Sequence, residues 1–269
     1  PGTGKTWFAK ATAKEAGVQF LQLNLGSLLN MYVGNSEARL DKALRAIWHL
    51  GGICLIDELD QQLSSRGPGA ETGSSVDNRF LGRLLAFMAE PQLKGRVVFL
   101  AATNRPDLLD AALKRSGRFD RKVPFLPPTA PERAGVIAAQ LRFQDIHVEA
   151  RLVAGLEALA SEKATEPELA EALEDLVEAT DGWVHSDFQN LVGKAWELAQ
   201  ADDGLVSAEA LREAAHLLIP SGVEEHMLAV SLAEVNDLSL LPEAYRAQAQ
   251  ERRPSELLTR ESTRRTLRS

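Results

Sequence analysis

The first six residues, PGTGKT, are of the types that bind phosphate. In the loop pattern G-x-x-x-x-G-K-[ST], glycines let backbone N–H groups approach phosphate oxygens at the start of a helix. Gly2, Thr3 and Gly4 supply this turn. Lys5 is then expected to reach the outer phosphates of a nucleotide, and the Thr6 hydroxyl to ligate magnesium. Taken alone, the hexamer is also compatible with a simple Gly-Thr turn before a helix.

A pair of carboxylates follows the apolar run of ICLIDELD. The carboxyl end of a buried parallel strand is where open α/β sheets bind ligands. Asp57 there suits a direct or indirect role at magnesium, and Glu58 suits polarising an attacking water. The alternative is that these acids only end a strand and start a turn. Asp60, in the same stretch, suits a surface or capping role equally well.

Two further segments carry residues that can act on a phosphoryl group. RVVFLAATN ends in Asn104, whose amide can orient the water or contact the γ-phosphate, although an asparagine after a strand is usually a turn residue. Arg115 and Arg118 flank a Ser-Gly pair. Such arginines can stabilise the charge of a transferring phosphoryl group, an effect worth about 10³–10⁵ in rate. Surface ion pairs are the alternative for both arginines.

Strand-like and helix-like runs alternate in the first half of the chain. The strands are expected at residues 18–24, 53–57, 96–104 and 122–127, and helical stretches separate the first three. This alternation predicts a parallel sheet with helices on both faces. Residues 130–219 show only helical periodicity, a further helical stretch covers 223–235, and a polar tail follows. The expected domains are an α/β ATPase domain at 1–128, a helical lid at 129–220 and a C-terminal helical extension with a basic tail at 221–269.

Composition narrows the class of protein. The net charge is −8, but the 19 residues from Glu251 onward carry six arginines and three glutamates, so the body is more acidic still. An acidic body argues against a broad nucleic-acid surface. The arginine-rich tail either contacts an acidic partner or is a solvated, frayed terminus. The single cysteine, Cys54, is expected to be a buried, reduced thiol, and no apolar run is long enough to span a membrane.

Together these motifs give the chain a close resemblance to the classical AAA clade of the AAA+ ATPases. The resemblance covers residues 1–220 and depends on five segments in family order: PGTGKT, MYVGNSE, CLIDELD, ATNRPDLLDAALKRSGRFDR and ATDGWVHSDFQNLV. It implies a protein-remodelling ATPase that binds ATP and Mg²⁺. By that match Lys5 and Thr6 belong to Walker A, Asp57 and Glu58 to Walker B, and Asn104 is sensor 1.

The resemblance also implies an assembly. Arg115 and Arg118 occupy the positions of arginine fingers, which complete the nucleotide site of a neighbouring subunit, so a homo-oligomeric ring, usually of six, is expected. Tyr32 and Val33 occupy the first pore loop, whose aromatic residue grips an extended polypeptide in the central channel. Without the resemblance, these two residues suit a loop packed on the core. Residues 66–77 lie where the second pore loop is expected.

The chain departs from the family pattern near the adenine. Where the clade usually has a Gly-Ala pair, this chain has His185-Ser186. His185 is therefore expected to contact the nucleotide and alter its affinity or selectivity. The alternative is a histidine at a helix start that faces solvent.

The sequence begins inside the phosphate-binding motif. In the family, the strand before this loop is central in the sheet, between the strand ending at Asn104 and the one around residues 123–126. We expect PGTGKT to be a truncation point, so that the functional prediction describes a longer parent protein. The 269-residue chain is expected to bind ATP poorly and to be unstable, because unpaired buried backbone groups cost about 1–3 kcal/mol each.

The sequence therefore predicts a cytoplasmic ATPase ring that unfolds or threads protein substrates. Two alternatives are a AAA+ machine acting on nucleic acid, and a scaffold that binds nucleotide only to assemble. A basic pore would favour the first alternative, and MYVG in an acidic body speaks against it. Loss of a catalytic residue would favour the second, and Glu58, Asn104 and both arginines are present.

Overall fold

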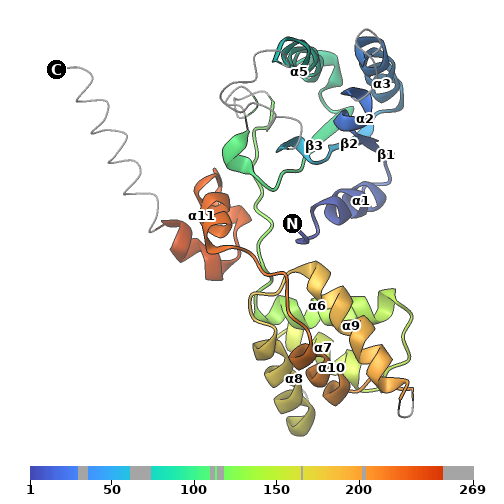
Figure 1. Ribbon diagram of the computed structural model, residues 1–269, viewed down its shortest axis with the longest axis vertical. Helices are drawn as coiled ribbons and strands as arrows, with labels where there is room; N and C mark the ends of the chain where they lie inside the picture. The colour runs from blue at the N-terminus through green and yellow to red at the C-terminus, as the bar shows by residue number, and fades with distance from the viewer. Residues whose placement is uncertain are drawn as a thin grey trace, which may run out of the picture. The chain divides into compact units, whose positions relative to one another are not determined.

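The described part of the computed structural model comprises residues 1–29, 36–60, 74–109, 113, 118–164, 166–201 and 204–250. These residues form two compact units (Figure 1). The sheet unit contains residues 5–124 and 230–240, and the helical unit contains residues 1–4, 125–229 and 241–250.

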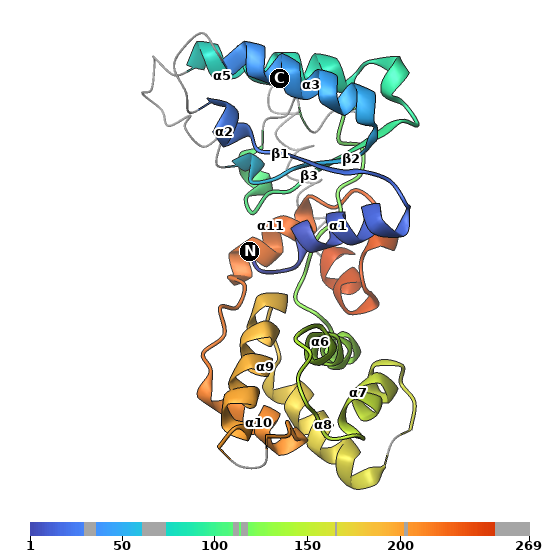
Figure 2. The ribbon, with the colours of Figure 1, turned by 90° about the vertical axis from the view of Figure 1, so that its right-hand side faces the viewer.

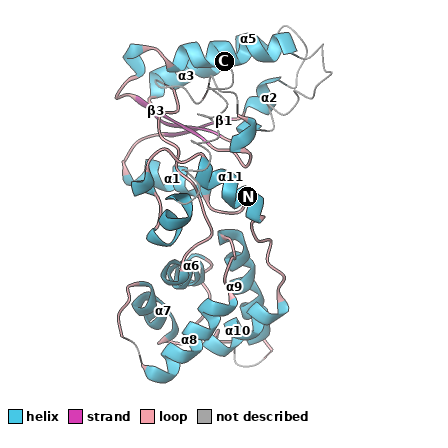
Figure 3. Cartoon of the chain, turned by 90° about the vertical axis from the view of Figure 1, so that its left-hand side faces the viewer, coloured by secondary structure: helices cyan, strands magenta, loops and turns pink. Residues whose placement is uncertain are grey.

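The sheet unit is built on three parallel strands in the order β1-β2-β3. The strands are drawn in magenta in Figure 3. The strands are β1 (Phe20–Leu23), β2 (Gly52–Ile56) and β3 (Val97–Ala101). Helices connect them, as parallel pairing requires. These connections contain α2 (Leu25–Leu29), α3 (Ser36–Leu50), α5 (Ser74–Met88) and the short 3₁₀ turn η1 (Pro91–Leu93). The predicted α/β architecture is confirmed.

Strand β2 is buried on both faces, because its side chains alternate between two apolar layers. Cys54 and Ile56 pack with buried leucines of α3 and α5, while Leu55 points to the opposite face and packs with Ala9 and Ala102. Ala9 belongs to α1 (Lys5–Glu15). Figure 2 shows α1 on one side of the strands and α3 with α5 on the other. The prediction of helices on both faces of the sheet is therefore correct.

The helical unit buries a separate apolar core. Its helices are α6 (Ala130–Phe143), α7 (Leu152–Ala160), α8 (Pro167–Ala179), α9 (His185–Ala199) and α10 (Ala208–Leu217). Every helix gives an apolar stripe to one cluster, which includes Ile137, Leu156, Leu176, Phe188 and Leu211. The all-helical region predicted after the sheet is confirmed.

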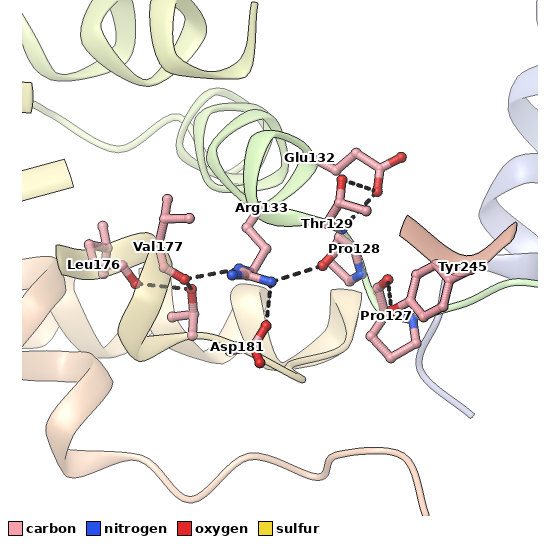
Figure 4. A network of polar contacts seen from close by, with 10 residues as sticks. Pro127, Pro128, Thr129, Glu132, Arg133, Leu176, Val177, Asp181 and Tyr245 are labelled. Carbon is pink, nitrogen blue, oxygen red and sulfur yellow. Dashed lines mark hydrogen bonds and ion pairs between the residues drawn. The ribbon is translucent and has the colours of Figure 1, made fainter. Parts of the chain in front are cut away.

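A buried arginine holds the start of α6 in place (Figure 4). Thr129 and Glu132 form a capping box at its N-terminus, with the Thr129 N–H donating to the Glu132 carboxylate at 2.8 Å. One turn further on, the Arg133 guanidinium donates to the carbonyl oxygens of Val177 (2.9 Å) and Pro128 (3.1 Å). It also pairs with Asp181 at 2.8 Å. These bonds tie the end of α8 to the segment that enters α6.

The predicted strand at residues 122–127 is wrong. Among the described residues this segment has no ladder partner, and its backbone groups bond to residues far along the chain instead. The Lys122 N–H donates to Asn236 Oδ1 at 3.3 Å, and the Pro127 carbonyl accepts from the Tyr245 hydroxyl at 3.0 Å. The run KVPFLPP contains three prolines, which lack the N–H donor that a ladder needs. Its apolar residues suggested a strand that its prolines disfavour.

The C-terminal extension contains more helix than the stretch expected at residues 223–235. Helix α11 (Glu225–Ala233) is followed by the 3₁₀ turn η3 (Leu238–Leu240), and residues 243–250 are helical. Leu241 and Ala249 are each 2% exposed. Within the sheet unit, Glu234 pairs with Lys122 at 2.8 Å. The sequence signal was weak because these residues bury only a few apolar side chains between exposed polar ones.

Candidate nucleotide-binding site

Two strand ends and one helix start converge in the sheet unit. Strand β2 ends at Ile56, directly before Asp57 and Glu58, and β3 ends at Ala101, shortly before Asn104. Parallel neighbours bring their carboxyl ends to the same edge of a sheet. Helix α1 begins at Lys5, so its first two side chains reach this edge from one face of the sheet.

Four of the predicted site residues are joined directly. The Lys5 ammonium donates to Asn104 Oδ1 at 2.7 Å. The Thr6 hydroxyl donates to Asp57 Oδ2 at 2.8 Å. Each contact joins residues about fifty or a hundred positions apart in sequence, so the fold rather than local chain geometry brings them together.

The electrostatic setting of Lys5 is a balance between burial and charge. Burial lowers the pKa of its ammonium group, and the carboxylates of Asp57 and Asp60 act in the opposite direction. The lysine is thus partly withdrawn from water while anionic groups face it. A desolvated cation in this position interacts strongly with any further anion, because the local dielectric is low.

Glu58 has an unusual backbone conformation for its residue type. Its φ is +53°, in the left-handed region that residues other than glycine rarely adopt. Its backbone N–H donates to Asp57 Oδ1 at 3.0 Å, and its side chain is exposed. The Asp57 carboxylate thus bonds to Thr6, while the Glu58 carboxylate is exposed to solvent. Backbone strain of this kind costs about 1–3 kcal/mol and tends to occur at functional sites.

The glycine turn belongs to the helical unit, where it packs against the start of α9. Gly2 and Gly4 have φ of +73° and +89°. The Ser186 N–H donates to the Gly2 carbonyl oxygen at 3.0 Å. A Cβ built on Gly2 would overlap the Ser186 hydroxyl, so both the φ and the space require glycine there. Thr3 is 5% exposed, and its hydroxyl has no partner among the described residues.

His185 is the first residue of α9 and lies near Gly4. It is half-buried, so the solvent-facing alternative does not describe it. Its Nδ1 is buried without a hydrogen-bond partner in the part of the chain that the structure describes. Burial lowers the pKa of its imidazole, and the Glu132 carboxylate opposes that effect. Neighbouring Asp187 fixes the helix start by accepting the N–H groups of Val184 and Ser221, each at 3.0 Å.

Some predicted residues lie outside the described part of the chain. They are Tyr32, Val33 and Arg115, together with most of the expected second pore loop at residues 66–77. Arg118 is described and half-buried. The roles proposed for these residues stay predictions.

Three contacts of the site were not predicted from the sequence. Asp60 accepts hydrogen bonds from Thr103 and Asn104, and Ser186 bonds to Gly2. For Asp60 the sequence contained a usable signal. A carboxylate two residues after Glu58 follows the same strand end, so it was a candidate partner for the residues that follow β3.

The residues present fit a magnesium-bound nucleotide. A threonine hydroxyl that donates to a carboxylate, as Thr6 does to Asp57, keeps its oxygen lone pairs for a hard cation. Magnesium usually takes one or two protein ligands and fills its remaining positions with water and phosphate oxygens. Lys5 offers a desolvated cation in the same helical turn as Thr6. This donor set suits a nucleoside polyphosphate.

Fold and site together define a nucleotide-binding α/β protein with a helical region after the sheet, and comparison with known proteins assigns the family. Residues 1–126 match the model of the AAA family, described as ATPases associated with various cellular activities. Residues 1–126 of the chain belong to this family of AAA+ ATPases. The family resemblance read from the sequence is thereby confirmed.

Curated relatives cover different lengths of the chain. A mitochondrial inner membrane m-AAA protease component of Mus musculus is 43% identical over 143 residues, which is 53% of this chain and 18% of the relative. The ATP-dependent zinc metalloprotease FtsH of Pelobacter propionicus is 34% identical over 236 residues, 87% of this chain and 34% of the relative. FtsH of Thermotoga maritima is 34% identical over 200 residues, 74% and 29% respectively. The chain thus spans about a third or less of these relatives.

Two further properties bear on these relatives. Within the described ranges, no helix is both long and apolar enough to cross a membrane. Among the same residues, no three or more His, Cys, Asp or Glu side chains gather where they could hold a metal ion. Zinc is part of the name of the FtsH relatives and is said of them alone.

Proposed function

We propose that this chain is the ATPase part of a protein that hydrolyses ATP, with magnesium, to unfold or thread protein substrates. The observation that carries the proposal is the pair of contacts Lys5–Asn104 and Thr6–Asp57 at the carboxyl edge of the sheet. We assign the ATPase core to residues 1–128, the lid to 129–220 and an extension to 221–269.

In this proposal each residue of the edge has one task. Lys5 contacts the outer phosphates of ATP, and Asn104 orients the attacking water. The Thr6 hydroxyl and the Asp57 carboxylate hold magnesium, which when bound neutralises charge on the phosphates. Glu58 accepts a proton from the water as it attacks, since its exposed carboxylate follows the residue that holds the cation.

We also assign nucleotide contacts to the glycine turn and to His185. Gly2, Thr3 and Gly4 present backbone N–H groups to the phosphates, as positive-φ glycines allow. His185 Nδ1, buried without a protein partner among the described residues, is available to a polar group of the nucleotide. Its depressed pKa favours the neutral imidazole, which can accept a hydrogen bond.

We further propose a homo-oligomeric ring, a hexamer, in which Arg115 and Arg118 act on the nucleotide of a neighbouring subunit. Tyr32 and Val33 would contact an extended polypeptide in its channel, because aromatic and aliphatic side chains bind peptides largely regardless of sequence. Family membership and the protease relatives support this direction. Nucleic acid is not expected as a substrate. A cytoplasmic location also stays a prediction, which fractionation of tagged cells would test.

The decisive experiment is ATP turnover measured against protein concentration, for the 269-residue chain and for a version extended upstream in its gene. Glu58→Gln should abolish turnover without abolishing ATP binding. Glu90→Gln, at an exposed glutamate whose side chain caps nothing, is the matched control and should behave as wild type. Specific activity that rises with concentration would support sites completed between subunits.

Two other results would redirect the proposal. A folded, extended protein that binds ATP but does not turn it over at any concentration would indicate a nucleotide-dependent scaffold. Stimulation of turnover by single-stranded DNA rather than by unfolded polypeptide would indicate a nucleic-acid machine. Loss of polypeptide stimulation in Tyr32→Ala, with basal turnover kept, is the expected signature of threading.

A further inference from the structure

A buried carboxylate connects the ends of strands β2 and β3. Asp60 is 8% exposed, and one of its oxygens, Oδ1, accepts two hydrogen bonds. The Thr103 hydroxyl donates to it at 2.8 Å, and the Asn104 backbone N–H donates to it at 3.1 Å. The sequence suggests a surface or capping role for Asp60. In the structure it bonds to the backbone of Asn104, whose side chain contacts Lys5.

The connection extends the register of the sheet beyond its strands. The Ala102 N–H donates to the Ile56 carbonyl at 2.9 Å, and the Leu59 N–H donates to the Ala102 carbonyl at 3.1 Å. The Thr103 hydroxyl, while donating to Asp60, accepts the Arg105 N–H at 2.9 Å. Residues 102–104 are therefore hydrogen-bonded to residues 56–60, and Asp60 is the only charged acceptor among these bonds.

Asn104 is fixed through both its backbone and its side chain. Its backbone N–H is bound to Asp60, and its side-chain oxygen accepts from the Lys5 ammonium at 2.7 Å. We propose that Asp60 is a positioning residue for ATP hydrolysis, which sets where the Asn104 amide lies relative to Lys5. The inference rests on the proposed function for its catalytic meaning, and on the hydrogen bonds alone for its geometric meaning.

A merely structural role makes a different prediction. If Asp60 only stabilised the end of β3, its loss would lower stability and leave the turnover of the folded fraction unchanged. A positioning role predicts that kcat falls while substrate binding is kept, because misplacement by about 1 Å costs up to about 10² in rate. It also predicts rescue by asparagine, whose amide oxygen can accept the same two bonds.

The test uses the gene-extended protein and its Asp60→Ala and Asp60→Asn variants. The matched control is Asp41→Ala. It removes a carboxylate of α3, in the same sheet unit, that pairs with the exposed Arg83 of α5. We expect Asp60→Ala to lower kcat by about 10- to 100-fold with KM for ATP changed less than about threefold. Asp60→Asn should stay within about fivefold of wild type, and Asp41→Ala should be unchanged.

Amide hydrogen exchange supplies a readout that does not need turnover. In Asp60→Ala the Asn104 amide should exchange at least about tenfold faster, while the amides of Val97–Ala101 keep their protection. Asp60→Asn should restore protection at Asn104. If the wild type hydrolyses no ATP, the proposed function fails, and exchange at Asn104 still decides whether Asp60 holds it.

Three outcomes would overturn the inference. The first is unchanged exchange at Asn104 in Asp60→Ala. The second is a loss of activity confined to KM, which would mean that Asp60 supports binding. The third is an Asp60→Asn variant as slow as Asp60→Ala, which would mean that the negative charge near Lys5, rather than the hydrogen-bond acceptor, is what matters.

Discussion

Replacing Arg133 by methionine should destabilise the helical unit by about 2–4 kcal/mol. The Arg133 side chain is 8% exposed and donates to two carbonyl oxygens and one carboxylate (Figure 4). Methionine keeps most of the aliphatic volume but offers no donor. Pro128 is buried and would lose the donor to its carbonyl, which costs about 1–3 kcal/mol. Val177 would lose less, because its carbonyl also accepts from the Thr180 hydroxyl at 3.1 Å.

The ion pair contributes little to this total. The Asp181 side chain is 81% exposed, and pairs with a solvated partner are worth about 0–1 kcal/mol. Asp181→Asn is therefore the matched control, with an expected cost below about 1 kcal/mol. Arg133→Lys should fall between the two, because one ammonium cannot reach both carbonyls with the geometry of a guanidinium.

Urea unfolding followed by tryptophan fluorescence measures these differences. Trp183 and Trp196 belong to the helical unit, so a background of Trp7→Phe and Trp48→Phe restricts the signal to that unit. The reasoning is refuted if Arg133→Met costs less than about 1 kcal/mol, or if Asp181→Asn costs as much as Arg133→Met. The second result would mean that the ion pair, and not the carbonyl bonds, carries the stability.

Three further predictions concern the site and the core. Gly2→Ala should weaken ADP binding at least about tenfold, since the φ of +73° at this position costs alanine about 1–2 kcal/mol. Adding Ser186→Ala removes the overlap with the new Cβ but not the cost of the φ, so it should restore binding only in part. The pKa of His185 in the folded protein lies below its value of 6.5 in the unfolded chain, so the contribution of His185 to stability is constant above pH 6.5 and turns unfavourable as the pH falls below 6.5. The urea midpoints of wild type and His185→Gln should therefore diverge only below pH 6.5. Burial raises the pKa of Cys54 to about 12, so a disulfide thiol reagent at pH 8 should label it only in urea, and rapid labelling of the folded chain would contradict the packing of β2.

Periodicity predicted most of the fold because most elements obey a simple burial pattern. In β2 every residue is apolar, as expected for a strand covered on both faces, and Cys54 and Leu55 duly face different layers. Helices α6 and α9 have single apolar stripes and lie within residues 130–219, where the sequence shows only helical periodicity. The segment at 122–127 failed because apolar character predicts burial, while strand formation also needs donors and a neighbour.

The site was predictable to the extent that its motifs are local. Lys5, Thr6 and Asp57 were found because residue type and spacing imply their chemistry, and the strand pattern put Asn104 at the same edge. The sequence does not decide the role of Asp60, because its hydrogen bonds depend on the stagger between strands β2 and β3, which the sequence alone does not fix. The contact between Gly2 and Ser186 joins segments far apart in the sequence, and no local pattern encodes it.

The order of Lys5 and Thr6 follows from the geometry of a helix above a sheet. Consecutive residues of an α-helix point about 100° apart, and neighbouring strands lie about 4.8 Å apart. Two adjacent side chains at the start of α1 can therefore reach two different strands: Lys5 reaches the end of β3, and Thr6 reaches the end of β2. A cation and a hydroxyl are thus presented side by side, each against the polar group that follows its own strand. Because a parallel sheet brings those ends together, two residues of one helix suffice to join both strand ends into one site.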